Sequence, residues 1–190
     1  MTERLSRIAP DEMTTEQAEI YARFADGRRA APGSAFTLVH PDGGLTGPPN
    51  AWLRSPPLAR VLEQMGWAMR FELTLSDRAR EIAILLLAFH RDSPFELYAH
   101  RKAGRAAGLT DAEIEGLATR TPPTFRSDEE RHVFATTLAL VDRRTLDDAE
   151  YAAAVAVLGE RTLFELVTLL GYYDFVATQL AVFGVAPPEA

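Results

Sequence analysis

The sequence predicts an all-α fold, and three observations carry this prediction. Apolar residues recur at spacings of three and four along most of the chain after residue 57. Helix-starting residues and glycines border these segments, whereas the one candidate strand, residues 36–39, is short and lies between proline and glycine residues. The 190 residues are 47% hydrophobic, which is enough to bury a sizeable core. We therefore expect a single-domain bundle of about seven to eight helices.

The first 57 residues differ in character from the remainder. Residues 1–13 are polar and are expected to form an N-terminal arm, so that the helical domain spans residues 14–190. Residues 28–57 are rich in proline and glycine, yet they contain apolar side chains, including Trp52, that a solvated linker does not need. We expect an ordered, packed loop here. A loop of this length inside a compact domain is often functional, as a lid or as one wall of a pocket.

Two sequence patterns divide the C-terminal part of the chain into helices. Ser93 precedes a segment with proline at its first helical position and Ser-x-x-Glu spacing, which is a strong helix-start signal. The last two helices are expected to meet at Gly159. The earlier one begins at Asp147 or Asp148, and the later one ends at Phe183, before a glycine and two prolines.

Composition and charge exclude several classes of function. Twenty basic against 27 acidic side chains give a net charge of -7, which argues against a nucleic-acid partner or an anionic membrane surface. The chain has no cysteine, so disulfides, thiolate metal sites and thiol peroxidase chemistry are excluded. The longest apolar run, Ile82 to Phe89, is too short to span a bilayer, and the N-terminus lacks a signal-peptide core. We expect a cytoplasmic protein with a small-molecule substrate.

The histidines outside the central segment show no ligand pattern. His40, His90 and His132 are far apart and belong to no His-x-x-x-His or His/Asp cluster. A metal site needs three or four converging ligands. We therefore expect surface or capping histidines and no metal site.

The segment from Ser76 to Gly108 concentrates ionisable residues against an apolar background. Glu81 begins the long apolar run, where an unpaired carboxylate is expensive to bury. Glu96 and His100 are four residues apart, which places them on one face of a helix. Imidazole is suited to acid/base catalysis near neutral pH, and a neighbouring carboxylate raises its pKa and fixes its tautomer. These three residues are the predicted catalytic site.

Each of these assignments has a structural alternative that the residues leave open. Glu96 could act only as the third helical residue of a capping box with Ser93. Glu81 could serve the first turn of its helix, or pair with Arg78 or Arg80. The histidine could be a partly exposed helix residue beside two basic neighbours.

Four sequence patterns resemble a known family. They are R-E-I-A-I-L at 80–85, E-x-x-x-H at 96–100, A-x-x-x-G-L-T-x-x-E-I at 103–114 and L-G-E-R-T-L-F-E-L-V at 158–167. Together they resemble the carboxymuconolactone decarboxylase and AhpD-like superfamily, over roughly residues 45–188. The resemblance implies an AhpD-like helical bundle that assembles into dimers, trimers or hexamers, with the active site near a subunit interface.

The match to the peroxidase branch of this superfamily is incomplete. That branch carries a Glu, then Cys-x-x-Cys, then a His four residues beyond the second cysteine. Glu81 matches the Glu and His100 matches the His, but Ser93 and Glu96 occupy the two cysteine positions. The sequence therefore resembles the decarboxylase side, which acts on a carboxylated muconolactone without a metal or organic cofactor.

The chemistry implied by this resemblance suggests further site residues. Decarboxylation of an unsaturated lactone acid leaves a dienolate-like carbanion that must be protonated, and His100 is the expected acid/base. Arg80 is a candidate for binding a substrate carboxylate, although a structural ion pair is the simpler role. Tyr98, Trp52 and Tyr173 are candidates for the substrate pocket, with a role as core or interface aromatics as the alternative for Tyr173. The alternative function is a non-catalytic helical oligomer that binds a small hydrophobic ligand or a protein partner.

Overall fold

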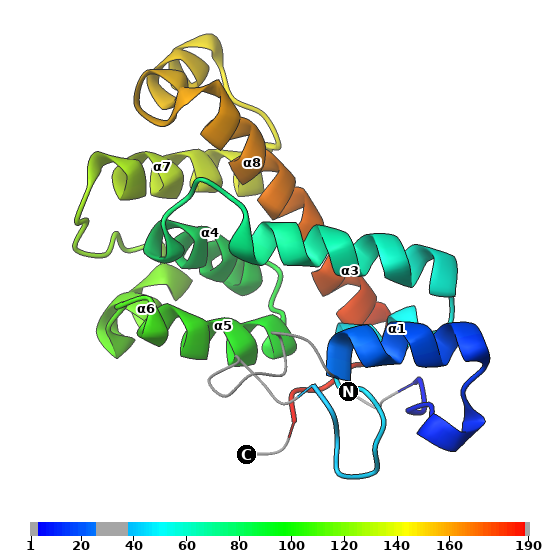
Figure 1. Cartoon of the computed structure of the whole chain (residues 1–190). Helices are drawn as coiled ribbons and strands as arrows, with labels where there is room; N and C mark the ends of the chain where they lie inside the picture. The colour runs from blue at the N-terminus through cyan, green and yellow to red at the C-terminus, as the bar shows by residue number, and fades with distance from the viewer. Residues whose placement is uncertain (1–3, 26–37, 189–190) are drawn as a thin grey trace. The chain divides into compact units, whose positions relative to one another are not determined.

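The computed structural model of the chain describes residues 4–25 and 38–188. Within these ranges every regular element is a helix, which confirms the predicted all-α class (Figure 1). Part of the candidate strand at 36–39 lies outside the described residues, and Val39 forms only a single antiparallel bridge with Leu45. None of the described helices combines the length and the apolar character needed to cross a membrane.

The chain divides into two compact units, residues 1–71 with 178–190, and residues 72–177. The first unit contains the 3-10 helix η1 (Pro10–Glu12) and the helices α1 (Thr15–Ala25), α2 (Pro48–Trp52) and α3 (Pro56–Phe71). The second contains α4 (Asp77–His90), α5 (Pro94–Ala106), α6 (Asp111–Ala118), α7 (Asp128–Arg143) and most of α8 (Asp148–Phe183). The predicted division into an arm at 1–13 and a domain at 14–190 stays a prediction.

The first unit corrects one expectation about residues 28–57. The described part of this segment is not only a loop, because Pro48 and Pro49 begin the short helix α2. Proline suits the first turn of a helix because its missing N–H would be unpaired there in any case. Trp52 at the end of α2 is buried, its ring lies 6.0 Å from that of Phe24, and its Nε1 donates to Gln179 at 2.7 Å. The expectation of packed apolar side chains is therefore met at Trp52.

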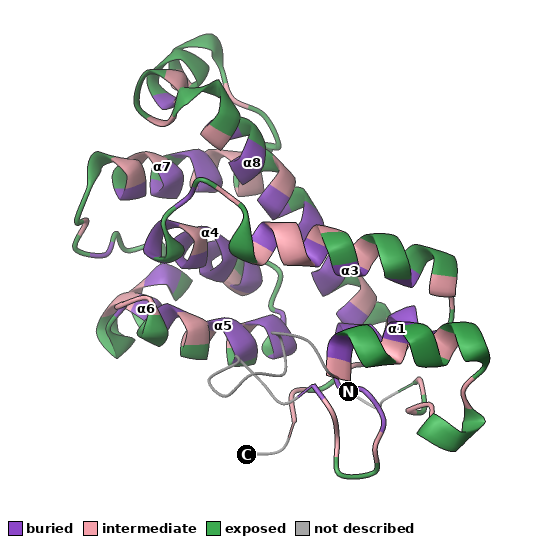
Figure 2. Cartoon of the chain, viewed as in Figure 1, coloured by how far each residue is buried: buried purple, intermediate pink, exposed green. Residues whose placement is uncertain are grey.

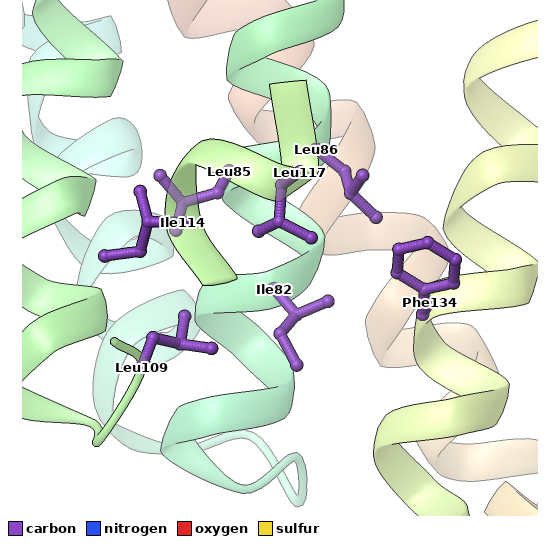
Figure 3. Close-up of a cluster of buried hydrophobic side chains, with 7 residues drawn as sticks. All are labelled: Ile82, Leu85, Leu86, Leu109, Ile114, Leu117 and Phe134. Atoms are coloured by element: carbon purple, nitrogen blue, oxygen red, sulfur yellow. The ribbon is translucent and has the colours of Figure 1, made fainter. Parts of the chain in front are cut away.

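The second unit is built around α4, which packs against α5, α6 and α7. Nearly all of its residues from Arg78 to Ala88 are buried, as the apolar run predicted (Figure 2). Ser76 caps its N-terminus by accepting a hydrogen bond from the Ala79 N–H at 3.3 Å. The core cluster consists of Ile82, Leu85, Leu86, Leu109, Ile114, Leu117 and Phe134 (Figure 3). This core holds α4 rigidly enough to present its polar side chains at defined positions.

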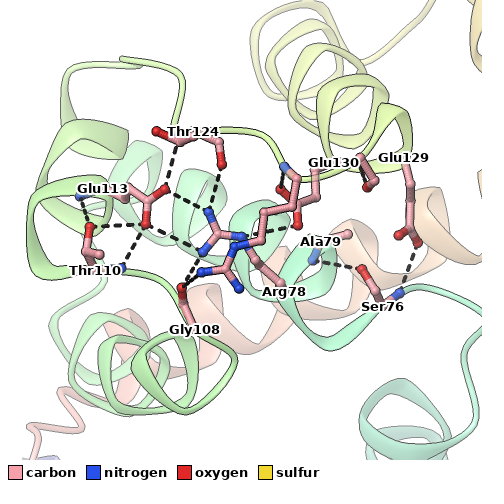
Figure 4. Close-up of polar contacts among 11 residues, drawn as sticks. Ser76, Arg78, Ala79, Gly108, Thr110, Glu113, Thr124, Glu129 and Glu130 are labelled. Carbon is pink, nitrogen blue, oxygen red and sulfur yellow. Dashed lines mark hydrogen bonds and ion pairs between the residues drawn. The ribbon is translucent and has the colours of Figure 1, made fainter.

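One such side chain is the buried Arg78, which the sequence analysis considered only as a possible partner of Glu81. Its guanidinium donates to the carbonyls of Gly108 at 2.5 Å and Thr124 at 3.1 Å, and to Glu113 Oε1 at 2.7 Å (Figure 4). Its Nε lies 3.1 Å from Glu130 Oε1. These contacts, which we call the Arg78 cluster, connect α4 to α6, α7 and two connecting loops.

Helix α8 is two helical segments that meet at Gly159. This glycine has φ 76° and ψ 161°, a conformation outside the helical region that glycine adopts readily. The predicted break at Gly159 is therefore confirmed. The second segment ends at Phe183, as predicted, and the Val185 N–H donates back to the Leu180 carbonyl at 2.9 Å.

Candidate active site

Helices α4 and α5 bring Glu81, Glu96 and His100 into direct contact. Glu81 comes from α4, while Glu96 and His100 lie one turn apart on α5. The imidazole Nδ1 lies 2.7 Å from Glu81 Oε2, and Nε2 lies 3.2 Å from Glu96 Oε2. Both ring nitrogens thus face a carboxylate. We call these three residues the His100 cluster.

The His100 cluster is almost fully enclosed. The side chains of His100, Glu81 and Glu96 are 7%, 4% and 6% exposed. Burial on its own lowers the pKa of His100, but the charge and hydrogen bond of Glu81, and then those of Glu96, outweigh it and raise the pKa to about 9. At neutral pH the ring is therefore an imidazolium that donates from Nδ1 to Glu81 and from Nε2 to Glu96.

The structure tests one of the two interpretations of Glu96 that the sequence left open, its role in a capping box. The Ser93 side chain makes no capping hydrogen bond, and the Ser93 N–H donates to the Ala88 carbonyl at 3.0 Å. The capping-box interpretation is therefore wrong, because Glu96 pairs with His100 one turn further along the helix. The same spacing at Thr110 and Glu113 does form a complete capping box.

Arg80 lies beside the cluster and contacts two carboxylates of its own helix. Its Nη1 lies 2.8 Å from Asp77 Oδ1, and its Nε lies 3.4 Å from Glu81 Oε1. Of the two arginines considered as partners for Glu81, Arg80 is thus the neighbour, and Arg78 serves its own cluster instead. Glu81 lies between a guanidinium and the imidazole ring. The predicted contact between Arg80 and a substrate carboxylate stays a prediction.

The predicted aromatic residues are distributed unevenly around the cluster. The Tyr173 ring, from α8, meets the His100 ring edge to face, with centroids 4.9 Å apart at 88°. Tyr172 packs in the same way against Tyr173, with centroids 5.3 Å apart. Tyr98 is carried by α5 and is 38% exposed. Trp52 belongs to the first unit, so its role in the pocket stays a prediction.

The remaining histidines have separate surroundings. His40 Nδ1 lies 2.9 Å from Asp42 Oδ2, and His132 Nδ1 lies 2.9 Å from the Asp128 carbonyl. His90, at the end of α4, lines a surface cavity that is described below. Among the residues that the structure describes, no three histidine or carboxylate side chains are placed to hold a metal ion.

Part of the chain is similar to a known family of proteins. Residues 56–139, which include the whole His100 cluster, match the carboxymuconolactone decarboxylase family. This match confirms the resemblance that the sequence patterns predicted. The comparison with curated proteins gave no match.

Solved structures show the same fold. An uncharacterised peroxidase-related protein with an alkylhydroperoxidase AhpD core, from Ralstonia eutropha JMP134, has a TM-score of 0.73 at 10% identity, covering 98% of this chain and 93% of its own. A protein of unknown function from Agrobacterium tumefaciens, suggested to be an antioxidant defence protein AhpD, has a TM-score of 0.65 at 16% identity, covering 74% and 97%. An uncharacterised peroxidase-related protein from Silicibacter sp. TM1040 has a TM-score of 0.63 at 14% identity, covering 73% and 74%.

Proposed function

We propose that the protein is a cofactor-independent acid/base enzyme, a decarboxylase-like lyase acting on a small carboxylated or lactone-type substrate. The observation that carries the proposal is the buried His100, whose two ring nitrogens face Glu81 and Glu96. The family match supports this chemistry, because the matched segment contains all three residues. The 190 residues contain no cysteine, so the thiol chemistry of a peroxidase has no nucleophile here.

In the proposed reaction His100 supplies the proton that replaces carbon dioxide. The bond between the carboxylate carbon and its neighbour breaks, and its electron pair passes into the conjugated lactone as a dienolate. Carbon dioxide leaves, and the imidazolium protonates the carbanion carbon. Solvent then returns a proton to the neutral imidazole, so the net change consumes one proton and releases one carbon dioxide. With a pKa of about 9, His100 begins each cycle with the proton to donate.

The two carboxylates have different roles in this proposal. Glu81 holds Nδ1 through the shorter contact of 2.7 Å and is itself held beside Arg80, so it fixes the ring and keeps it charged. Glu96 meets Nε2 at the longer distance of 3.2 Å. We assign proton delivery to Nε2, because the longer contact is the easier one to exchange for a substrate.

The arrangement favours a chemical role over a purely structural one. A buried ion cluster contributes little net stability, because desolvation of the charges offsets their attraction. Catalytic groups need pKa values that suit their chemistry, and titratable groups with strongly shifted pKa values are therefore common at functional sites. The His100 cluster is buried where α4 and α5 meet, and its central group has a pKa raised from 6.5 to about 9.

The proposal also includes substrate contacts and an oligomeric state. We assign substrate contacts to Arg80, Tyr98, Trp52 and Tyr173. We also propose that the protein forms a homo-oligomer, either a dimer, a trimer or a hexamer. Exposed apolar side chains on α8 support assembly: Phe164 is 70% exposed, and Phe175 lies on the same face.

The test is a turnover screen of the wild type, His100→Ala and a matched control, His132→Ala. The panel contains muconolactones, 3-oxo acids and enol-lactones, and products are followed by NMR. We expect a product from the wild type and from the His132 variant, and none from His100→Ala. Equal turnover by all three proteins would remove His100 from the chemistry. Helical content measured by circular dichroism shows whether the inactive variant is folded.

A further inference from the structure

A concave site lies within the second unit, and no residue of the His100 cluster lines it. It is a cavity of about 210 Å³ bordered by the C-terminal ends of α4 and α7 and by the middle of α8. Its apolar lining consists of Leu87, Leu140, Val141, Val167 and Leu170. The lining also includes Gly171, where an added Cβ would meet no atom within 4 Å. The cavity is therefore an apolar recess with open space in front of the glycine.

Three basic residues line the same cavity. They are His90 and Arg91 at the end of α4, and Arg144 at the end of α7. Arg91 Nε lies 3.0 Å from Asp174, the one acidic residue of the lining. Among the described residues, no carboxylate lies within ion-pair distance of the Arg144 guanidinium, and no hydrogen bond joins its side chain to the protein.

Basic residues are also favoured at helix C-termini, where they satisfy the last carbonyls. Here those carbonyls have backbone partners already. The Leu87 carbonyl accepts from the Arg91 N–H, the Phe89 carbonyl accepts from the Asp92 N–H, and the Leu140 carbonyl accepts from the Arg144 N–H. Helix capping therefore does not use the Arg144 side chain.

The backbone at Arg144 is a second, independent observation. Its φ of 59° and ψ of 23° place it in the left-handed region that helix ends normally fill with glycine. The nearby Arg120 shares this conformation, but it is paired with Asp142 at 2.8 Å. Arg144 is thus held in a strained conformation, with its charge at the edge of the cavity and no carboxylate of the described chain to neutralise it.

We propose that this cavity binds a small amphipathic carboxylate. The hydrocarbon part would pack on the leucine and valine lining, and the carboxylate would meet Arg144, with His90 and Arg91 beside it. A volume of about 210 Å³ is below the usual range for drug-sized ligands. The ligand class is therefore an acid of the size of benzoate or hexanoate.

The test uses the full chain and benzoate as the probe, with the uncharged benzamide as its isostere. Binding is followed by ¹H–¹⁵N NMR, so that shifts at the amides of Gly171 and Arg144 report occupation of this cavity. We expect saturable shifts with benzoate, and affinity for benzamide at least about tenfold weaker, because a charge-assisted contact is lost. Equal binding of the two probes would contradict the proposal, as would the absence of saturable shifts at these amides.

Two variants test the site without threatening the fold. Arg144→Gly removes the cation and also relieves the left-handed backbone, so it should fold at least as well as the wild type. Gly171→Leu adds a side chain to the lining of the cavity, at a position where its Cβ meets no atom within 4 Å. Each should weaken benzoate binding by about tenfold or more. Unchanged affinity in both would overturn the proposal.

Two control variants distinguish this proposal from the proposed function. Arg105→Gln removes an exposed arginine that pairs with Asp111 and lies outside the cavity, and it should leave binding unchanged. His100→Ala should also leave the cavity shifts unchanged. If His100→Ala abolishes them while Arg144→Gly does not, benzoate is occupying the candidate active site and the proposal for this cavity fails.

Discussion

Helix α4 carries two buried ion clusters, and they differ in whether their central cation can lose its proton. Arg78 is held by two carboxylates and two backbone carbonyls, and a guanidinium stays charged at every pH that the fold survives. Three residues later, Glu81 holds an imidazolium that can give up a proton when the pH rises through about 9. Buried charge is therefore found both in the structural Arg78 cluster and in the candidate site. The candidate site differs because its central cation, His100, can lose its proton.

Removal of the Arg78 guanidinium should have the largest effect on stability. Arg78→Met leaves the buried Glu130 and the partly buried Glu113 without their cation, and breaking a buried ion pair from one side typically costs about 3–5 kcal/mol. We expect a large fall in the urea midpoint, or failure to fold. The exposed Arg105→Met serves as the control and should change the free energy of unfolding by less than about 0.5 kcal/mol. A stable Arg78→Met protein would show that the cluster does not hold the helices together.

The two clusters should lose their stabilising effect at opposite ends of the pH range. The folded pKa of His100 is raised from 6.5 to about 9, so its contribution is fully present below pH 6.5 and is lost as pH rises through 9. That shift corresponds to on the order of 3 kcal/mol. The stability difference between wild type and His100→Gln, measured by denaturation at several pH values, should therefore shrink between about pH 7 and 10. A difference that grows over this range would contradict the assignment.

Glu113 in the Arg78 cluster should behave in the opposite sense. Burial on its own raises its pKa, but hydrogen bonds from Arg78 and Thr110 outweigh burial and lower the pKa from 4.5 to about 2. Its contribution is present above pH 4.5 and is lost as pH falls towards 2. Glu113→Gln should therefore lower the free energy of unfolding at neutral pH and change it little at low pH. Acid-denaturation measurements compare the two conditions. The same penalty at both pH values would exclude this linkage.

Within the His100 cluster the two carboxylates should contribute unequally. Glu81→Gln removes the larger favourable contribution to the imidazolium, so we expect the pKa of His100 to fall by about 1–3 units. Glu96→Gln should lower it less, because its contact of 3.2 Å is longer than the 2.7 Å contact of Glu81. NMR titration of the ring measures both values. A reversed order would exchange the roles assigned to the two carboxylates.

The smallest expected difference in stability is between variants at two helix N-termini that have the same sequence spacing. Thr110→Ala breaks a complete capping box and should cost about 1 kcal/mol. Ser93→Ala removes a side chain that makes no capping hydrogen bond, so we expect no capping penalty. Thermal denaturation of the two variants makes the comparison. An equal cost would mean that Ser93 caps α5 in solution.

Much of the fold could be predicted from local patterns. The apolar run of α4 and the glycine at position 159 act within a few residues of sequence, and both predictions are confirmed. The i, i+4 spacing placed Glu96 and His100 on one face because helix geometry requires it. These features depend on backbone geometry and not on tertiary contacts.

The remaining features depend on side-chain partners from distant segments. Glu96 has the spacing of a capping box, but the choice between Ser93 and His100 is settled by packing against α4. Arg78 gave no sequence signal, since its partners come from residues 108–130. The helix α2 was missed because two prolines in a glycine-rich segment indicated a loop, although proline is also favoured in the first helical turn.

The most direct test of the central claim is the titration of the His100 ring in the wild-type protein. ¹⁵N NMR of the imidazole distinguishes a ring protonated at both nitrogens from a single neutral tautomer, and His100→Gln identifies its signals. The structure predicts an imidazolium at neutral pH, with both nitrogens protonated, that titrates near pH 9. A ring that is neutral at pH 7, titrating at or below the ordinary value of about 6.5, would contradict the account.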